Sequence, residues 1–244
     1  MSTHTKTSSL LLLFITLLSF TPTKILNWQL VDDQLLPLHD PVEGQVIHQT
    51  LSSDVNADGI FERLILESGV LTVHQVSSEY TIGEAPLWQS PPEWDVKQSE
   101  ISDLDGDGKP EITLLVYRPF EPWPIDQFIP HGGRINGFHD EQGMSCHFIL
   151  IAWRDDSFRE IWAGSALASP VRSFKPADLD GDGLQELIVI ESDYTAKTGD
   201  PGRSLSVWSW NGFGFSLVTR QYGHFQDFSV SRNSYGDLFL SATQ

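Results

Sequence analysis

Three short acidic segments carry the residue types that bind metal ions. They begin at Asp54, Asp103 and Asp178, and they align with one another without gaps. Each has Asp or Asn at positions 1, 3 and 5, Gly at position 6 and Glu at position 9, and an apolar run follows. With the backbone carbonyl of position 7 included, the predicted metal ligands are Asp54, Asn56, Asp58, Ile60, Glu62, Asp103, Asp105, Asp107, Lys109, Glu111, Asp178, Asp180, Asp182, Leu184 and Glu186.

This spacing suits a hard divalent cation, and Ca²⁺ is the predicted cofactor. Calcium takes about six to eight oxygen ligands, and alternate side chains of a tight loop point toward one ion. Gly at position 6 permits the turn. An EF-hand begins in the same way but needs an acidic residue at position 12. That position holds Ile65, Leu114 and Val189, which excludes the EF-hand three times.

The alternative interpretation is that the segments are solvated acidic turns, since Asp, Asn and Gly favour turns without any ligand. Three copies in one register, each leading into an apolar strand, argue against it. The first loop is the weakest candidate, because Asn56 lowers its charge and Ala57 stands where the other loops have Gly.

The sequence around each loop repeats as a unit of four short strands. In the third unit these are the segment 170–177 before the loop, the apolar run 187–190, the alternating strand 205–210 and the short strand 217–218. Asn211-Gly212 is a hairpin signal between the last two. No helical period is found beyond the N-terminal segment. Repeated four-stranded units predict an all-β fold, a β-propeller-like array of four-stranded blades.

The number of units bears on how the array closes. Three repeats are clear, and the second carries an insertion at about 118–147. Residues 45–52 and the tail 228–242 look like halves of a further unit, which predicts a composite closing blade. The alternatives are an open ring or a ring completed by a second chain. Because open sheet edges invite pairing, those alternatives favour a homo-oligomer.

The loops and strands resemble those of FG-GAP repeats, also grouped with VCBS repeats, which occur in the integrin α head propeller and in bacterial surface proteins. The similarity covers about residues 54–218. It implies a β-propeller with calcium in the loop that joins two strands of a blade. The family usually has about seven blades, and this chain departs from that pattern.

Composition and charge limit the classes of partner. The chain has 244 residues, a formal net charge of −18 and one cysteine, Cys146. A surface with this net negative charge repels nucleic acid and anionic lipid.

Residues 1–23 contain a weakly basic start and an apolar run, Leu10 to Phe20, that is too short to span a membrane. We interpret 1–23 as a signal peptide or N-terminal anchor and 24–244 as the propeller domain. The expected location is outside the cytoplasm: extracellular, at the cell surface or periplasmic. Membrane contact is expected only through 1–23, if this segment is uncleaved.

The insertion is the most distinctive segment outside the loops. It is rich in Pro, Gly and aromatic residues, and long insertions in compact folds are often functional. Its candidate ligand-binding residues are Trp123, Phe128, His131, Arg134, Phe138 and His139. The equally weighted alternative is a lid over a sheet edge or a plug in the channel.

Cys146 and His147 are adjacent on a strand, so their side chains should point to opposite faces. A buried Cys146 is therefore favoured over a catalytic one.

Three functional hypotheses remain open at this point. The first is a non-enzymatic binding, adhesion or scaffold module, stabilised by calcium, whose partner is an extracellular protein or a surface glycan. The second is an enzyme that acts on polysaccharide, although no catalytic motif is visible. The third is a purely structural envelope protein. Fold alone does not choose among them.

Overall fold

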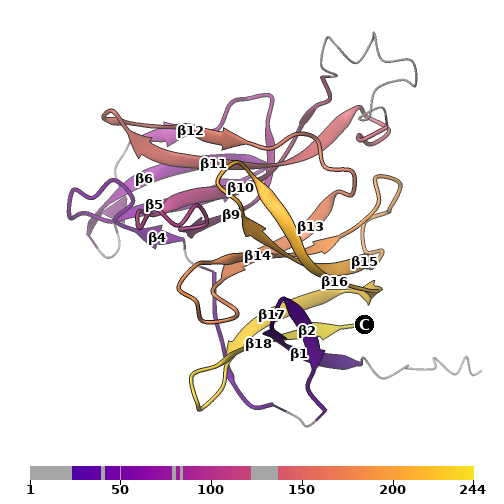
Figure 1. The fold of residues 1–244 in the computed structure, drawn as a ribbon. Helices are drawn as coiled ribbons and strands as arrows, with labels where there is room; N and C mark the ends of the chain where they lie inside the picture. Colours follow the sequence, from indigo (N-terminus) through magenta and orange to yellow (C-terminus); the bar gives the residue numbers. More distant parts are fainter. Residues whose placement is uncertain (1–23, 40–41, 50, 79–80, 83–84, 122–136) are drawn as a thin grey trace, which may run out of the picture.

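The computed structural model describes residues 24–39, 42–49, 51–78, 81–82, 85–121 and 137–244 (Figure 1). Every regular element in these ranges is a β-strand, and none of their segments is a helix long and apolar enough to cross a membrane. The segment 1–23, predicted as a signal peptide or anchor, lies outside the described residues.

The strands form four antiparallel sheets, arranged as a four-bladed β-propeller. The first blade contains β4 (Ser52–Ser53), β5 (Glu62–Glu67), β6 (Val70–Ser78), β7 (Thr81–Ile82) and β8 (Trp88–Gln89). The second blade contains β9 (Asp95–Ser102), β10 (Glu111–Pro119), β11 (Met144–Arg154) and β12 (Ser157–Ala163). The third blade contains β13 (Val171–Ala177), β14 (Glu186–Glu191), β15 (Gly202–Trp210) and β16 (Phe215–Phe225).

The fourth sheet is built from both ends of the domain, and we call it the composite blade. Its strand order is β2-β1-β18-β17-β3, with bounds β1 (Ile25–Val31), β2 (Gln34–Pro37), β3 (Gln45–Val46), β17 (Asp227–Arg232) and β18 (Leu238–Thr243). β1 pairs with β18, so that Ile25 lies opposite Thr243. The predicted composite closing blade is therefore confirmed.

The sequence misplaced the N-terminal half of that blade. Residues 45–52 were expected to supply it, but only Gln45–Val46 belong to the sheet, as a short edge strand beside β17. Ser52–Ser53 pair with β5 in the first blade. The strands that complete the sheet are β1 and β2, which the repeat alignment did not include because they precede every acidic loop.

The strand predictions for the three repeats hold. The apolar runs after the loops are β5, β10 and β14, and the alternating strands are β6, β11 and β15. β10 extends to Pro119 and β11 starts at Met144, which lies opposite it, so strands enter the predicted insertion from both sides. The connection between them is 120–143.

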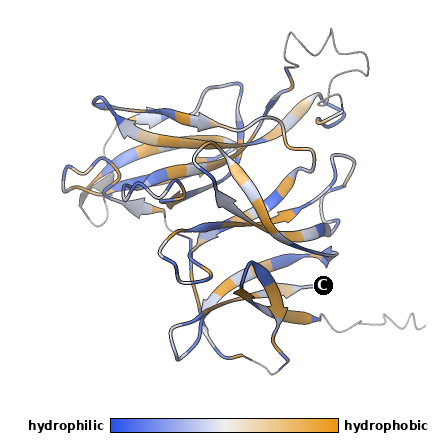
Figure 2. Ribbon diagram, in the orientation of Figure 1, coloured by the Kyte–Doolittle hydropathy of each residue, from blue (hydrophilic) through white to orange (hydrophobic). Residues whose placement is uncertain are grey.

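Apolar residues gather on the strands and polar residues on the connections (Figure 2). Three core clusters join successive blades. Leu71, Ile112 and Ile149 belong to the cluster between the first and second blades. Phe148 and Leu187 belong to the one between the second and third blades, and the third cluster joins the third blade to the composite blade. Trp88 and Trp153 pack against the first of these clusters, and Trp162, Trp208 and Trp210 pack against the second.

Polar contacts join the first strands of neighbouring blades. The Gln98 amide on β9 donates to the Phe174 carbonyl on β13 at 2.7 Å and accepts its N–H at 3.1 Å. Lys175 on β13 forms a 3.1 Å ion pair with the buried Glu100 on β9. Charged and amide side chains thus add polar contacts between the first strands of the second and third blades, beside the apolar cluster that contains Phe174.

Candidate metal centres

Each acidic loop joins the first strand of a blade to its second strand. The loops run over 54–61 between β4 and β5, 103–110 between β9 and β10, and 178–185 between β13 and β14. The paired strands hold position 9 opposite the residue before position 1, as Ser53 lies opposite Glu62. Antiparallel pairing therefore brings the first and last predicted side-chain ligands of each loop together.

The glutamates at position 9 are buried, with exposed fractions of 0% for Glu62, 1% for Glu111 and 5% for Glu186. Each carboxylate accepts the backbone N–H of position 2 in its own loop, at 2.8, 2.6 and 2.8 Å respectively. Through this hydrogen bond, the carboxylate at position 9 holds the start of its loop in place. The repeat alignment marked this residue as a ligand but gave no sign of the hydrogen bond.

The aspartates at position 1 close the loops from the other side. The Oδ2 atoms of Asp54, Asp103 and Asp178 accept the N–H of the position 6 glycine at 2.9, 3.1 and 3.1 Å. These glycines have φ of 86°, 78° and 94°, a region that residues with a side chain rarely adopt. The invariant Gly within the three loops therefore has a conformational cause.

Carboxylate oxygens converge in two of the loops. In the second loop one oxygen from each of Asp103, Asp105 and Glu111 lies within 4.8 Å of the others. In the third loop Asp178, Asp180 and Glu186 form the same group. These are positions 1, 3 and 9 of the predicted ligand set. Such clusters, which include a buried glutamate, can hold a metal ion.

The first loop has an amide in place of one carboxylate. The Asn56 Oδ1 atom accepts the N–H of Asp58 at 2.9 Å, and its Nδ2 atom donates to the Asp58 carboxylate at 3.1 Å. Ala57 has φ of 61°, matching the glycines at position 4 of the other loops. This loop keeps the shape of the others with one charge fewer.

Two oxygens in the loops are buried without a hydrogen-bond partner among the described residues. They are Oε1 of Glu62 and Oδ1 of Asp103. A buried carboxylate oxygen that receives no hydrogen bond costs free energy, and nearby negative charge increases that cost. A cation beside these oxygens would remove the cost, so the residues present fit a bound ion.

The same environment changes proton affinity. Burial, with a smaller contribution from the charges of Asp105 and Asp103, raises the pKa of Glu111 to about 8. Burial raises the pKa of Glu186 to about 7, again with a contribution from its acidic neighbours. The pKa of Glu62 is raised by burial too. Without a cation, these carboxyls therefore hold a proton at pH values where surface glutamates are ionised.

Position 5 has a different role in the loop geometry. The Oδ1 atoms of Asp58, Asp107 and Asp182 accept the N–H of position 7 at 2.8, 2.8 and 2.7 Å. In the second loop, Asp107 also forms a 2.9 Å ion pair with Arg154. Position 5 is not a member of the converging groups. Its ligand role stays a prediction, as does that of the carbonyls of Ile60, Lys109 and Leu184.

One contact between two loops was not visible in the sequence. The Gln185 side-chain carbonyl accepts the N–H of Asp103 at 2.9 Å, which links the third loop to the second. Leu184 lies close to Gly106 across the same boundary. The second and third acidic loops are therefore neighbours at one end of the propeller.

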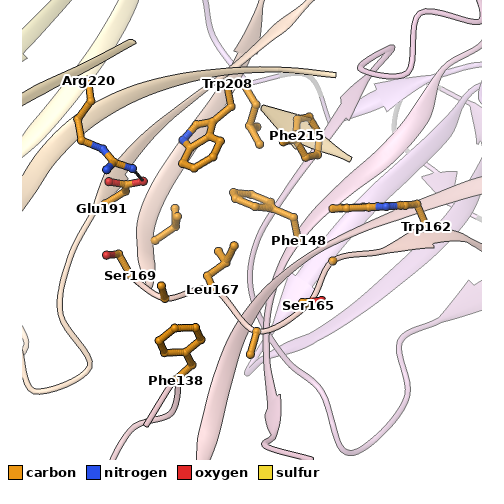
Figure 3. Close-up of a pocket in the computed structure, with 15 residues that line it drawn as sticks. Phe138, Phe148, Trp162, Ser165, Leu167, Ser169, Glu191, Trp208, Phe215 and Arg220 are labelled. Atoms are coloured by element: carbon orange, nitrogen blue, oxygen red, sulfur yellow. Dashed lines mark hydrogen bonds and ion pairs between the residues drawn. The ribbon is translucent and has the colours of Figure 1, made fainter. Parts of the chain in front are cut away.

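The candidate ligand-binding residues of the insertion divide into two groups. Phe138 lies in a cavity between the second and third blades (Figure 3). His139 packs beside Phe120, with ring centroids 5.0 Å apart, and its Nδ1 atom contacts the Asp140 carbonyl. The remaining predicted residues, Trp123, Phe128, His131 and Arg134, lie outside the described residues.

Cys146 and His147 do not form a nucleophile pair. Cys146 is fully buried, and this burial raises the pKa of its thiol to about 12. His147 contacts Ser145 Oγ at 2.7 Å and the Gly164 carbonyl at 2.9 Å. Burial lowers its pKa to about 4. The prediction that Cys146 is buried is confirmed.

No protein-family model matches the chain, and the comparison with curated proteins yields no match.

Proposed function

We propose that this protein is an exported, calcium-stabilised β-propeller that acts as a non-enzymatic binding or scaffold module. The observation that supports the proposal is found in the second and third acidic loops, where the carboxylates of positions 1 and 3 converge with the buried glutamate of position 9. The unpartnered oxygens of Glu62 and Asp103 support a cation in the first two loops.

Calcium fits this set better than other common ions do. All the candidate donors are oxygens, which hard cations prefer, and zinc usually takes nitrogen or sulfur ligands. Magnesium demands near-ideal octahedral geometry and keeps several waters. Loops of three acidic or amide side chains plus a carbonyl, with flexible coordination number, suit the larger calcium ion.

Calcium would act mainly on stability. A ligand that binds only the folded state stabilises it by mass action. Each loop connects two strands of a blade, so an ion there would hold the blade together at one end. The net charge of −18 would otherwise destabilise the folded chain by self-repulsion.

The test is a calcium titration of the chain 24–244, followed by thermal unfolding and by isothermal titration calorimetry. Extracellular calcium modules often bind at about 10⁻⁴–10⁻³ M, so the titration must reach millimolar concentrations. We expect two or three ions per chain, a higher melting temperature with calcium than with chelator, and a smaller effect of magnesium. Absence of binding and of any shift would reduce the loops to acidic turns.

The binding role has its own test. The resemblance to FG-GAP repeats and the predicted export segment support a partner outside the cytoplasm, either a protein or a surface glycan. A glycan array and an array of extracellular protein domains, each probed with and without calcium, distinguish these partners. Calcium-dependent capture by one class supports the module. Capture by neither class, with the calcium titration positive, would favour a structural role in the envelope.

A further inference from the structure

A cavity of about 440 Å³ lies between the second and third blades (Figure 3). Its walls come from strands β11 to β16, from the connection between β12 and β13, and from Phe138 before β11. Five aromatic side chains line it: Phe138, Phe148, Trp162, Trp208 and Phe215. Figure 3 shows these rings around a common space, with Phe138 across from Trp208 and Phe215.

The aromatic walls are held by contacts with one another. Phe215 packs against Trp162 with ring centroids 5.4 Å apart and against Phe148 at 6.4 Å. The Trp162 indole N–H donates to the Phe213 carbonyl at 2.7 Å. Because ring contacts and a hydrogen bond fix these side chains, the cavity has preformed walls, as small-molecule sites usually do.

Small residues on the connection leave the space open. Gly164, Ser165, Ala166, Ala168 and Ser169 all line the cavity. Protein interiors are packed with few voids larger than a water molecule. An aromatic cavity of this size between two well-packed blades therefore differs from an ordinary packing gap. Phe138, the ring that faces this connection, comes from the 120–143 connection that interrupts the second repeat.

The charges at one end of the cavity are already paired. Glu191 accepts from Arg220 Nη2 at 2.8 Å and from Ser204 Oγ at 2.6 Å. Arg220 also donates from Nε to Ser206 Oγ at 2.9 Å, and its guanidinium lies 5.7 Å from the centre of the Trp208 ring. An anionic ligand would meet Glu191 and a cationic one Arg220. The pair thus offers no uncompensated charge to a ligand.

We propose that this cavity is a binding site for an uncharged aromatic molecule. The rings supply apolar faces and edges, which favour offset or edge-on packing with another ring. The hydroxyls of Ser165 and Ser169, which line the cavity, supply hydrogen-bonding groups for a polar substituent on the ligand. The volume falls within the range of about 300–1,000 Å³ found for small-molecule sites. This proposal is independent of the metal loops.

Two fluorescent probes with the same anilinonaphthalene skeleton test the proposal. N-phenyl-1-naphthylamine is uncharged, and 1-anilinonaphthalene-8-sulfonate carries one negative charge. We expect the uncharged probe to saturate at one site per chain, with energy transfer from tryptophan. The sulfonate should bind at least about tenfold more weakly, because burying a charge that has no partner is costly. The titrations are run both with calcium and with chelator. Probe binding in both conditions supports the cavity whether or not the loops bind calcium, so the two proposals are tested separately.

Matched variants locate the site. Ala166→Trp fills the cavity without removing any wall, and Ala196→Trp adds the same side chain at an exposed position outside it. The first should lose at least about tenfold in affinity for the uncharged probe, and the second should bind like the wild type. Phe138→Ala removes one aromatic wall of the cavity. Because Phe138 lies in a connection and not in a strand, the sheets should stay intact. This variant should bind the uncharged probe about fivefold more weakly or worse.

Thermal unfolding of each variant confirms that it is folded. The proposal is overturned if the uncharged probe does not saturate. It is also overturned if folded Ala166→Trp and Phe138→Ala proteins bind the probe as the wild type does, or if the sulfonate binds equally well.

Discussion

Calcium binding at the second acidic loop should be linked to proton release near neutral pH. Burial raises the pKa of Glu111 to about 8, so most free protein at pH 7 holds this carboxyl protonated. The proton must leave before the carboxylate can bind a cation. A pKa of about 8 leaves roughly 1% ionised at pH 6 and roughly 9% at pH 7. The apparent affinity of this loop should therefore rise about ninefold over that interval.

The third loop should respond over a lower pH range. With the pKa of Glu186 at about 7, its apparent affinity should rise about fivefold from pH 6 to 7 and less than about twofold from pH 7 to 8. At pH 7, filling both loops should release between one and two protons, about 0.9 from Glu111 and about 0.5 from Glu186.

Stability without calcium should follow the same groups. A carboxyl whose folded pKa is raised contributes stability below its unfolded pKa, about 4.5, and that contribution is lost as pH rises through the folded value. The chelated protein should therefore lose stability between pH 5 and about 8, and calcium should restore more of it at the higher pH.

The assay is isothermal titration calorimetry at pH 6, 7 and 8, in paired buffers that differ in ionisation enthalpy. Glu111→Gln keeps the shape and the hydrogen-bond acceptor but cannot ionise. This variant should bind more weakly at the second loop and should release about 0.9 fewer protons at pH 7. An affinity independent of pH between 6 and 8, together with equal heats in the paired buffers, would refute the reasoning.

Three further predictions concern stability, and urea unfolding checks each of them. Ala57→Gly should stabilise the chelated protein by about 0.5–1 kcal/mol, because glycine relieves the left-handed backbone at this position; destabilisation would contradict this. Lys175→Met should destabilise by about 3–5 kcal/mol, since it removes the Lys175 ammonium group that forms the ion pair with the buried Glu100 carboxylate. The double variant Lys175→Met/Glu100→Gln should recover part of the lost stability. If it is less stable than Lys175→Met alone, the ion pair is not the cause of the destabilisation. Gly202→Ala should cost about 1–3 kcal/mol, because its Cβ would press on Ile190 and on the Glu191 carbonyl; an unchanged midpoint would show that the sheet can yield there.

Much of the fold could be predicted because it repeats. The acidic loops fix the register of three blades, and the apolar runs after them had to be strands because they are too short and too β-branched for helices. The closing blade was harder. β1 and β2 carry no acidic loop before them, so only their pairing with β18 reveals their membership of the sheet.

The candidate sites divide along a similar line. The carboxylates that converge at positions 1, 3 and 9 are among the ligands that the spacing predicts. The hydrogen bond from Leu104 to Glu111 and the link from Gln185 to Asp103 depend on three-dimensional approach. The aromatic cavity was also out of reach, because Phe138 and Trp208 come from different blades and share no sequence pattern.

The pairing of Ile25 with Thr243 has a consequence for how the chain folds. Each of the first three blades can form from a continuous stretch of sequence, as soon as that stretch has been made. The composite blade requires closure of nearly the whole domain, and closing a loop of roughly 200 residues costs about 5 kcal/mol of chain entropy. Contacts between residues so distant in sequence also slow folding. We therefore expect this blade to assemble last and to exchange its amide hydrogens first, so the seam between β1 and β18 is the point at which the ring opens.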